Sequence, residues 1–251
     1  MVTQQQKQFK VLLIGDSCKD IYQYGYVDRI SPEAPVPIFV KTGSETKYGM
    51  VDNVAINLFA LGCDVHVVKG KESTKTRLID IRSKQQIVRV DEDVYSDPLD
   101  DIDLDVDPRD FDAIVISDYD KGLITYELVS RLRVAYNVPI FIDTKKTDLN
   151  RFSGCFVKIN ALEFSRIESD CDDLIITLGG DGAQYNGKIY PAKEVEVADV
   201  CGAGDTFLAA LTFKYLQTKN IEQSIQFAIN AASVTVQHLG VYAPSLEEIC
   251  D

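Results

Sequence analysis

The sequence has no apolar run that approaches the roughly 18 residues of a membrane-spanning helix. Its first ten residues, MVTQQQKQFK, are polar, and no apolar segment of the kind found in a secretory signal peptide follows them. Both absences predict a cytoplasmic protein with no membrane partner.

Paired cysteines and excess positive charge are also missing. The six cysteines stand at positions 18, 63, 155, 171, 201 and 250, and none belongs to a C-x-x-C pair, which argues against a zinc site and a disulfide framework and fits a reducing compartment. Because the net charge is −13, we expect no general binding to nucleic acid or to anionic membranes. Much of this charge lies in residues 91–112, which could form a metal or interaction tract, although a solvated connector is the simpler interpretation.

Three common catalytic signatures are absent as well. Gly70 and Lys71 lack the upstream glycine and the following hydroxyl residue of a Walker-type phosphate loop. No G-x-G-x-x-G follows the first predicted strand, which weakens a dinucleotide-binding dehydrogenase, and no G-x-S-x-G marks a hydrolase nucleophile.

What is present is an alternation of strands and helices over 251 residues, which is enough chain for a large core. Short β-branched apolar runs predict buried strands at 9–15, 113–117, 139–143 and 174–178. Helical patterns lie between or after them, at 52–61, 124–136, 205–217 and 221–238. We therefore predict one α/β domain over residues 1–251, with a parallel sheet covered on both faces and ligands at the carboxyl ends of its strands.

A different pattern occupies residues 22–48 and 75–92. Segments such as VPIFVKTG and QQIVRVDE place charged residues between apolar ones, as strands with one solvated face do. We expect these segments to form a small sheet beside the main domain, with the possible role of a lid.

The stretch DVCGAGDTFLAAL, residues 199–211, places an aspartate between two glycines and an apolar helix. A helix that begins after such a turn presents free N–H groups and a positive dipole end, which favour an anion. Asp205 could cap this helix, or it could accept a proton from a hydroxyl that attacks a bound phosphate. The residues alone leave both interpretations open.

This stretch resembles the C-terminal signature D-[TV]-x-G-A-G-D-x-F of the ribokinase-like (PfkB) sugar kinases. Residues 11–39, which contain SPEAPVP, are similar to the opening of the bacterial heptose 7-phosphate kinases, the kinase half of the bifunctional ADP-heptose synthesis enzyme. The resemblance covers nearly the whole chain in order. It implies a ribokinase-like three-layer α/β/α fold with a mostly parallel sheet and a small β lid, and ATP- and Mg²⁺-dependent phosphorylation of a sugar or sugar phosphate.

The resemblance also implies roles for individual residues. Asp205 matches the catalytic base, and the amides of Gly202, Ala203 and Gly204 match the anion hole for the transferring phosphoryl group. On the phosphate side, the family's N-x-x-E motif, which helps to hold Mg²⁺, and its D-P-K segment correspond to Asn160, Glu163, Asp143 and Lys145, with Thr144 in place of the proline. Nucleotide-binding positions correspond to Thr177, Gly179, Gly182 and Asn230, and sugar-binding positions to Asp16, Asp20 and Asn53.

Each of these positions also has an ordinary structural explanation. N-x-x-E is short enough to arise by chance in a surface turn, and T-L-G-G-D-G suits a plain hairpin turn. Asp16 and Asp20 could cap the element that follows the first strand. Beyond single residues, the resemblance implies a homodimer formed through the lid, and a monovalent cation such as K⁺ near Asp199 is an open possibility.

The chain departs from the family pattern at the sugar side. Where the family has G-G-A-A-N-V-A, residues 49–55 read GMVDNVA, so that Met50 replaces a glycine and should crowd the pocket. Asp52 should repel a phosphorylated sugar, unless it simply caps the following helix. Cys201 replaces a common threonine in the anion-hole turn.

Two blocks of the family pattern are shortened. Residues 65–70 run almost directly into 73–80, where the family has a further helix and strand, and Glu163 is followed within about ten residues by 172–178, where the family has a full helix. We expect the local topology to be trimmed or rewired, because a parallel crossover needs about a dozen residues. Two hypotheses remain: an active kinase, and a catalytically weak relative that binds nucleotide or a protein partner.

Overall fold

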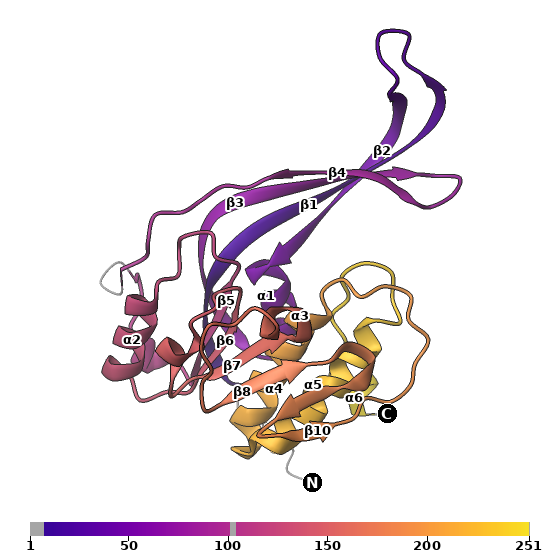
Figure 1. The fold of residues 1–251 in the computed structure, drawn as a ribbon. Helices are drawn as coiled ribbons and strands as arrows, with labels where there is room; N and C mark the ends of the chain where they lie inside the picture. Colours follow the sequence, from indigo (N-terminus) through magenta and orange to yellow (C-terminus); the bar gives the residue numbers. More distant parts are fainter. Residues whose placement is uncertain (1–7, 101–103, 251) are drawn as a thin grey trace.

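A mixed sheet organises the computed structural model, which describes residues 8–100 and 104–250 (Figure 1). Ten strands of this part of the chain form the order β10-β9-β8-β7-β6-β5-β1-β3-β4, with β2 paired to β1. The strands are β1 (Lys10–Ile30), β2 (Pro37–Met50), β3 (Asp64–Asp80), β4 (Gln86–Glu92), β5 (Ala113–Asp118), β6 (Ile140–Thr144), β7 (Phe156–Asn160), β8 (Leu174–Thr177), β9 (Ala183–Tyr185) and β10 (Lys188–Tyr190).

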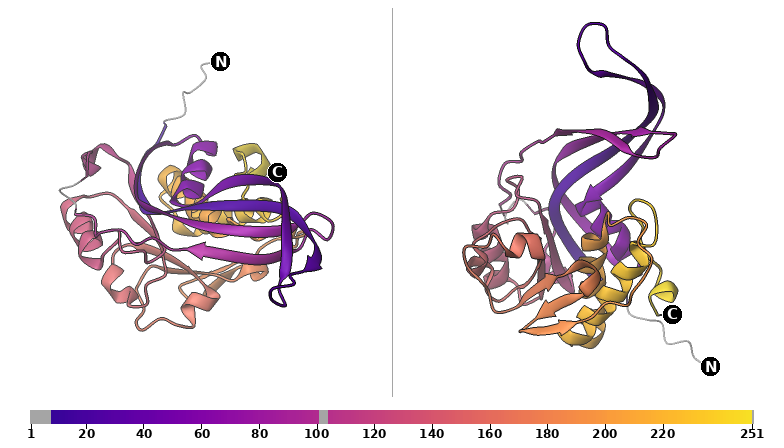
Figure 2. Two further views of the ribbon diagram at one scale, coloured as in Figure 1. Left: turned by 90° about the horizontal axis from the view of Figure 1, so that it is seen from above. Right: turned by 45° about the vertical axis from the view of Figure 1, so that its right-hand side comes forward.

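Helices cover both faces of this sheet, as Figure 2 shows from two further directions. They are α1 (Val51–Ala60), α2 (Tyr126–Ala135), α3 (Ala161–Phe164), α4 (Ala203–Thr218), α5 (Ile221–Thr235) and α6 (Leu246–Cys250), with 3-10 turns η2 (Pro108–Asp110), η3 (Leu149–Phe152) and η4 (Gly179–Asp181). The pairs β1–β3, β1–β5, β5–β6, β6–β7 and β7–β8 are parallel. The predicted three-layer architecture with a mostly parallel sheet is therefore confirmed.

The apolar strands form because alternate side chains enter two different cores. Val11 and Leu13 of β1 pack with α1, α4 and α5, whereas Leu12 and Ile14 pack on the opposite face with α2 and η3. Strands buried on both faces need continuous apolar runs, which is why those runs could be recognised in the sequence.

The helix boundaries differ from the predicted ones by a few residues, for local reasons. Helix α2 begins at Tyr126 because Thr125 caps it, its Oγ1 accepting the amide of Leu128 at 3.0 Å. Helix α4 begins at Ala203, earlier than expected, because Gly202 takes a left-handed conformation and turns the chain into the helix.

Beyond the core, β1 and β3 continue together as an arm. We use "arm" for residues 17–30 of β1, residues 72–80 of β3, and the antiparallel strands β2 and β4 that flank them. The arm projects from the body above the ends of the core strands (Figures 1 and 2). A register shift between Gly15 and Ser17 marks the change from core to arm, so Asp16 lies at this irregularity.

The two shortened blocks lead to simple connections. Strand β3 runs from the core into the arm without interruption. Strands β7 and β8 remain parallel neighbours, although only the four-residue helix α3 and a loop join them. The topology is trimmed at these places, and the parallel order is kept.

The acidic tract is an ordered connector over its described part. The amides of Ser96 and Leu99 donate to the carbonyls of Lys121 and Leu123, and Asp93 pairs with Lys121 at 2.6 Å. Residues 101–103 of the tract lie outside the described residues. In residues 8–100 and 104–250, no helix combines the length and apolar character needed to cross a bilayer.

We expect Gly15→Ala to destabilise the fold, because a Cβ at this position would lie 2.4 Å from the carbonyl oxygen of Ser117 in the neighbouring strand β5. Overpacking of this kind costs about 1–3 kcal/mol, which urea unfolding would measure. Gly43→Ala in the arm is the matched control, since nothing lies within 4 Å of its Cβ position. Equal unfolding midpoints for the two variants would contradict the prediction.

Candidate active site

The turn before α4 is the centre of the candidate site. Gly202 has a φ of 78°, and a Cβ there would lie 2.7 Å from Nδ2 of Asn53, so both conformation and space require glycine. In the described structure no side chain caps the first turn of α4. The predicted anion-hole residues Gly202, Ala203 and Gly204 thus stand at the positive end of a sixteen-residue helix.

Asp205 lies in the first turn of α4 and is 6% exposed. Asn53 of α1 donates to its Oδ2 at 2.7 Å, and Tyr119, just after β5, donates to its Oδ1 at 3.3 Å. Asp205 therefore does not act as a simple helix cap, because its oxygens face side chains from two other elements.

The surroundings of Asp205 favour proton uptake. Burial raises its pKa to about 6, against the hydrogen bond from Asn53, and the nearby charge of Asp143 also raises it while that of Lys158 lowers it. A carboxylate with a pKa in this range is mostly ionised at neutral pH and can still accept a proton.

A buried ion pair between Lys158 and Asp143 underlies the turn. Lys158 Nζ on β7 lies 2.7 Å from Asp143 Oδ2 on β6, and each residue is about 5% exposed or less. A Cβ at Gly204 would be 2.8 Å from the same ammonium. Sequence reasoning missed Lys158, because a single lysine gives no signal and the strand β7 that carries it was not among the predicted strands; only its adjacency to N-x-x-E could have pointed to it.

The N-x-x-E motif forms a capping box in the structure. Asn160 accepts the amide of Glu163 at 2.9 Å, and Glu163 accepts the amide of Asn160 at 2.8 Å, which fixes the start of α3. Glu163 also pairs with Lys145. Burial alone would lower the pKa of Lys145, but Asp143 and Glu163 outweigh this effect and raise it.

The described residues contain no cluster of three or more His, Cys, Asp or Glu arranged to hold a metal, and the N-x-x-E motif does not form one. Mg²⁺ does not need such a cluster, because it binds through one or two carboxylates and keeps water and phosphate oxygens as its other ligands. Asp143 Oδ1 is buried without a hydrogen-bond partner in the described structure, so an unused acceptor lies in this region. The donor set fits a magnesium ion bound together with phosphates.

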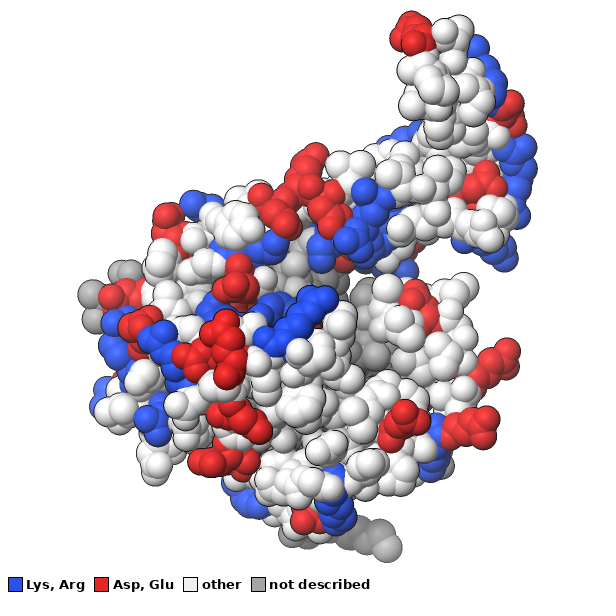
Figure 3. Space-filling view, viewed as in Figure 1, with Lys and Arg blue, Asp and Glu red and all other residues white. Residues whose placement is uncertain are grey.

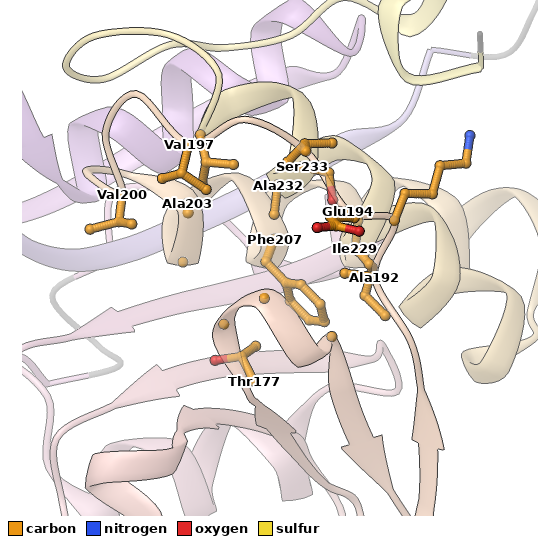
Figure 4. Close-up of a pocket in the computed structure, with 17 residues that line it drawn as sticks. Thr177, Ala192, Glu194, Val197, Val200, Ala203, Phe207, Ile229, Ala232 and Ser233 are labelled. Carbon is orange, nitrogen blue, oxygen red and sulfur yellow. Dashed lines mark hydrogen bonds between the residues drawn. The ribbon is translucent and has the colours of Figure 1, made fainter.

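A pocket of about 480 Å³ opens next to the G-A-G turn (Figure 4). Thr177, Gly179 and Gly182, predicted to contact a nucleotide, line it together with Ala203 and Gly204. Phe207 and Thr177 point into it from opposite sides, and Ile229 and Ala232 of α5 add apolar surface. The pocket combines an apolar chamber with the helix end that favours anions, as a nucleotide requires.

Asn230 is less directly placed. It lies on α5 between residues that line the pocket but is not itself one of them, and its Oδ1 is 3.5 Å from Nε2 of Gln226.

Asp199 lies before the turn, where it accepts the amides of Cys201 at 3.0 Å and Gly240 at 2.9 Å. Burial would raise the pKa of Asp199, but these backbone hydrogen bonds outweigh it and lower the pKa.

The predicted sugar-side residues lie where the arm meets the body. Asp16 is buried, and its Oδ2 accepts the amides of Tyr119 at 2.8 Å and Lys121 at 3.2 Å, while its Oδ1 has no partner in the described structure. Asp20 pairs with Arg77 on the neighbouring strand, with 2.8 Å between Oδ1 and Nη2. Lys and Arg side chains gather along the arm and on the part of the body that faces it (Figure 3).

Met50 stands in a conformation that glycine favours, with φ 56° and ψ −130°, and it is buried. A non-glycine residue in such a region carries strain of about 1–3 kcal/mol.

Asp52, which was expected to repel a phosphorylated sugar, has two partners in the structure: Lys69 Nζ lies 2.9 Å from its Oδ1, and Ser17 donates to its Oδ2 at 2.6 Å. Asp52 thus has a cation beside it, and no side-chain hydrogen bond caps α1.

Comparison with known proteins gives a consistent family. Residues 161–249 match the pfkB family carbohydrate kinase profile. The bifunctional proteins HldE of Nitratiruptor sp. and Campylobacter jejuni are each 32% identical to this chain, over 96% and 97% of it. The chain spans 64% of the length of each. The aligned length of 298 positions with the first exceeds the 251 residues of the chain, so the relatives carry segments that this chain lacks.

Solved structures share the fold at low sequence identity. Arabidopsis thaliana ribokinase, complexed with ribose and ATP, is 17% identical with a TM-score of 0.73, covering 97% of this chain and 98% of its own. Escherichia coli phosphofructokinase-2, in complex with potassium, is 16% identical with a TM-score of 0.69 and covers 97% of both chains. The ribokinase-like fold implied by the sequence resemblance is confirmed.

We expect Lys158→Met to destabilise the protein by about 3–5 kcal/mol in urea unfolding, because the buried carboxylate of Asp143 loses its counterion. Lys188→Met is the control, since Lys188 and Glu222 form an exposed pair at 2.7 Å, which contributes at most about 1 kcal/mol. A loss as small as that of the control would show that the buried pair is unimportant to the fold.

Proposed function

Because the chain belongs to the PfkB family of carbohydrate kinases, we propose that it transfers the γ-phosphoryl group of ATP to a hydroxyl of a sugar or sugar phosphate related to heptose 7-phosphate. One observation carries this proposal most directly. The pocket suited to a nucleotide ends at Ala203 and Gly204, and the next residue, Asp205, is a buried carboxylate with a pKa of about 6.

In this proposal Asp205 is the base. The acceptor hydroxyl gives its proton to the carboxylate as its oxygen attacks the γ-phosphorus, and ADP leaves. The amides of Gly202, Ala203 and Gly204 face the transferring group, and the positive end of α4 offsets its developing charge. The buried ammonium of Lys158 below Gly204 acts in the same direction.

Thr177, Gly179 and Gly182 would contact the nucleotide, with Asn230 near its base and Lys145 near its phosphates. Asn160 and Glu163 would help to hold Mg²⁺, which neutralises charge on the phosphate oxygens when bound. Asp16, Asp20 and Asn53 would face the sugar. The arm would serve as a lid over it, since the arm joins the body beside these residues.

The assembly and monovalent cation are parts of the same proposal. Exposed apolar side chains on the arm, among them Ile30, Val40, Ile87 and Val90, support a homodimer formed through the arm, which light scattering tests. The turn that Asp199 closes is a candidate for K⁺ binding, which activity with and without K⁺ tests. The six free cysteines suit the reducing cytoplasm, where ATP is available.

A second candidate function is nucleotide or partner binding with weak catalysis. Met50 favours it, because a buried methionine side chain stands at the start of α1, where the family has glycine, three residues before Asn53. The intact contacts of Asp205 favour the kinase, since binding alone gives no reason for a base held by two donors.

The first experiment is ADP release from ATP and Mg²⁺ over a panel of sugars and sugar phosphates that includes heptose 7-phosphate. We expect turnover on at least one member, and a loss of about 10²–10⁴-fold in Asp205→Asn, with ATP affinity retained. ATP binding by the wild type without turnover on any panel member would reject the kinase and favour the second candidate.

We also expect Met50→Gly to lower KM for the accepted sugar without changing the Kd for ATP, because glycine removes both the strain and the side chain. Lys84→Gly is the matched control: Lys84 also has a positive φ, 57°, but lies in the turn between β3 and β4. An equal change of KM in both variants, or none in Met50→Gly, would mean that Met50 does not restrict the pocket.

A further inference from the structure

Tyr119, like Lys158, belongs to the site although no sequence motif gave it a role. It follows directly after β5, and its hydroxyl lies 3.3 Å from Oδ1 of Asp205. Asn53 donates to the other oxygen at 2.7 Å. Two donors from separate elements thus hold the two oxygens of one carboxylate, which fixes its rotation.

The phenol is suited to remain a donor. The negative charge of Asp205 and burial raise the pKa of Tyr119 well above its usual value. The hydroxyl therefore keeps its proton across the physiological range, and its hydrogen can point at the carboxylate.

The backbone at Tyr119 is fixed by two further carboxylates. Asp16 accepts the amides of Tyr119 and Lys121, and Asp118 accepts the amide of Asp120 at 2.9 Å. Asp120 has a φ of 58°, which completes the turn. This network ties the position of the phenol to the junction of the core and the arm, where Asp16 lies.

The ring of Tyr119 lies near two cations from opposite sides of the site. Lys145 Nζ, beside the N-x-x-E motif, is 5.0 Å from its centroid, and Lys75 Nζ of the arm is 5.9 Å away. Such contacts hold an aromatic ring through its negative face. The ring therefore stands between the arm and the residues proposed to face the phosphates.

We propose that Tyr119 is a positioning residue that orients the catalytic carboxylate of Asp205 and stabilises its ionised form, a role that rests on the proposed kinase function. Oδ1 can accept a second hydrogen bond, because a carboxylate oxygen has two acceptor sites. With Asn53 on Oδ2 and Tyr119 on Oδ1, each oxygen keeps one acceptor site, and the one on Oδ1 can take the acceptor hydroxyl of the sugar.

Other charged groups also act on Asp205 and set the background for this role. Asp143 of β6 opposes ionisation, while Lys158 of β7 favours it, and Lys145 also lies close enough to interact with Asp205. Tyr119→Phe leaves these three residues and Asn53 in place. The variant therefore removes one hydrogen bond from an otherwise unchanged electrostatic environment.

The test is the pH dependence of kcat/KM in wild type and Tyr119→Phe. The base must be ionised, so the wild-type rate falls as the pH drops through about 6, the pKa of Asp205. Loss of a donor to the carboxylate raises that pKa, so we expect the acidic limb of Tyr119→Phe to move upward by about half a pH unit or more. We expect kcat to fall roughly ten- to hundred-fold through loss of orientation.

Tyr185→Phe is the matched control, because Tyr185 donates to the carboxylate of Asp173 at 2.7 Å on the outer strand β9. A merely structural role for tyrosine hydroxyls would affect both variants alike through stability. An acidic limb of Tyr119→Phe at the wild-type pH, or an equal shift in Tyr185→Phe, would overturn the proposal.

A second measurement does not depend on turnover. Titration of ¹³C-labelled aspartate carboxyl groups by NMR, with Asp205 assigned by its loss in Asp205→Asn, gives its midpoint in each variant. An upward shift in Tyr119→Phe supports the contact even if the wild type phosphorylates no sugar, in which case only the kinase proposal fails. An unchanged midpoint overturns the role of Tyr119 even if the wild type is an active kinase.

Discussion

The hydrogen bond from Asn53 to Asp205 holds the rest of the site together. It joins residues 152 positions apart in the sequence and packs the first turn of α1 against the first turn of α4. Because β2 of the arm leads directly into α1 through Met50, the same bond ties the arm to the proposed base. Asn53 lies within one helical turn of the end of β2, so its contact with Asp205 depends on where the arm places the start of α1.

Electrostatics decide how this acidic protein can offer a site for phosphates. The chain carries a net charge of −13, yet Lys158, Lys145 and Lys146 gather below the ends of the core strands. Each is paired with a carboxylate, whose charge offsets that of the ammonium group in a partly buried region. Among the described residues no cation is paired directly with Asp205, and burial raises its pKa. The three lysines are thus paired with carboxylates. Asp205, in contrast, is held by the neutral donors Asn53 and Tyr119 and can take up a proton.

Much of the fold could be predicted from the sequence because its cause is local. Strands buried on both faces need apolar runs, and the G-A-G-D turn needs glycines. Both patterns can be recognised in a single sequence. The residues T-L-G-G-D-G alone suited a plain hairpin turn, and the expectation that they contact a nucleotide came only from the family resemblance. Lys158 and Tyr119 could not be found in this way, because their importance comes from neighbours distant in sequence. The sequence did not show that Lys69 pairs with Asp52, because the two residues lie 17 positions apart, on a helix and on the strand that follows it.

The two shortened connections leave the parallel order of the sheet unchanged. The two side chains that donate hydrogen bonds to Asp205 come from α1 and from the turn after β5, and neither residue lies within a shortened connection. The connection between β7 and β8 still holds Asn160 and Glu163 in place, because their capping box is closed within four residues and needs no longer helix behind it. The carboxyl ends of β5, β6, β7 and β8 stay in parallel register although the connection between β7 and β8 is short.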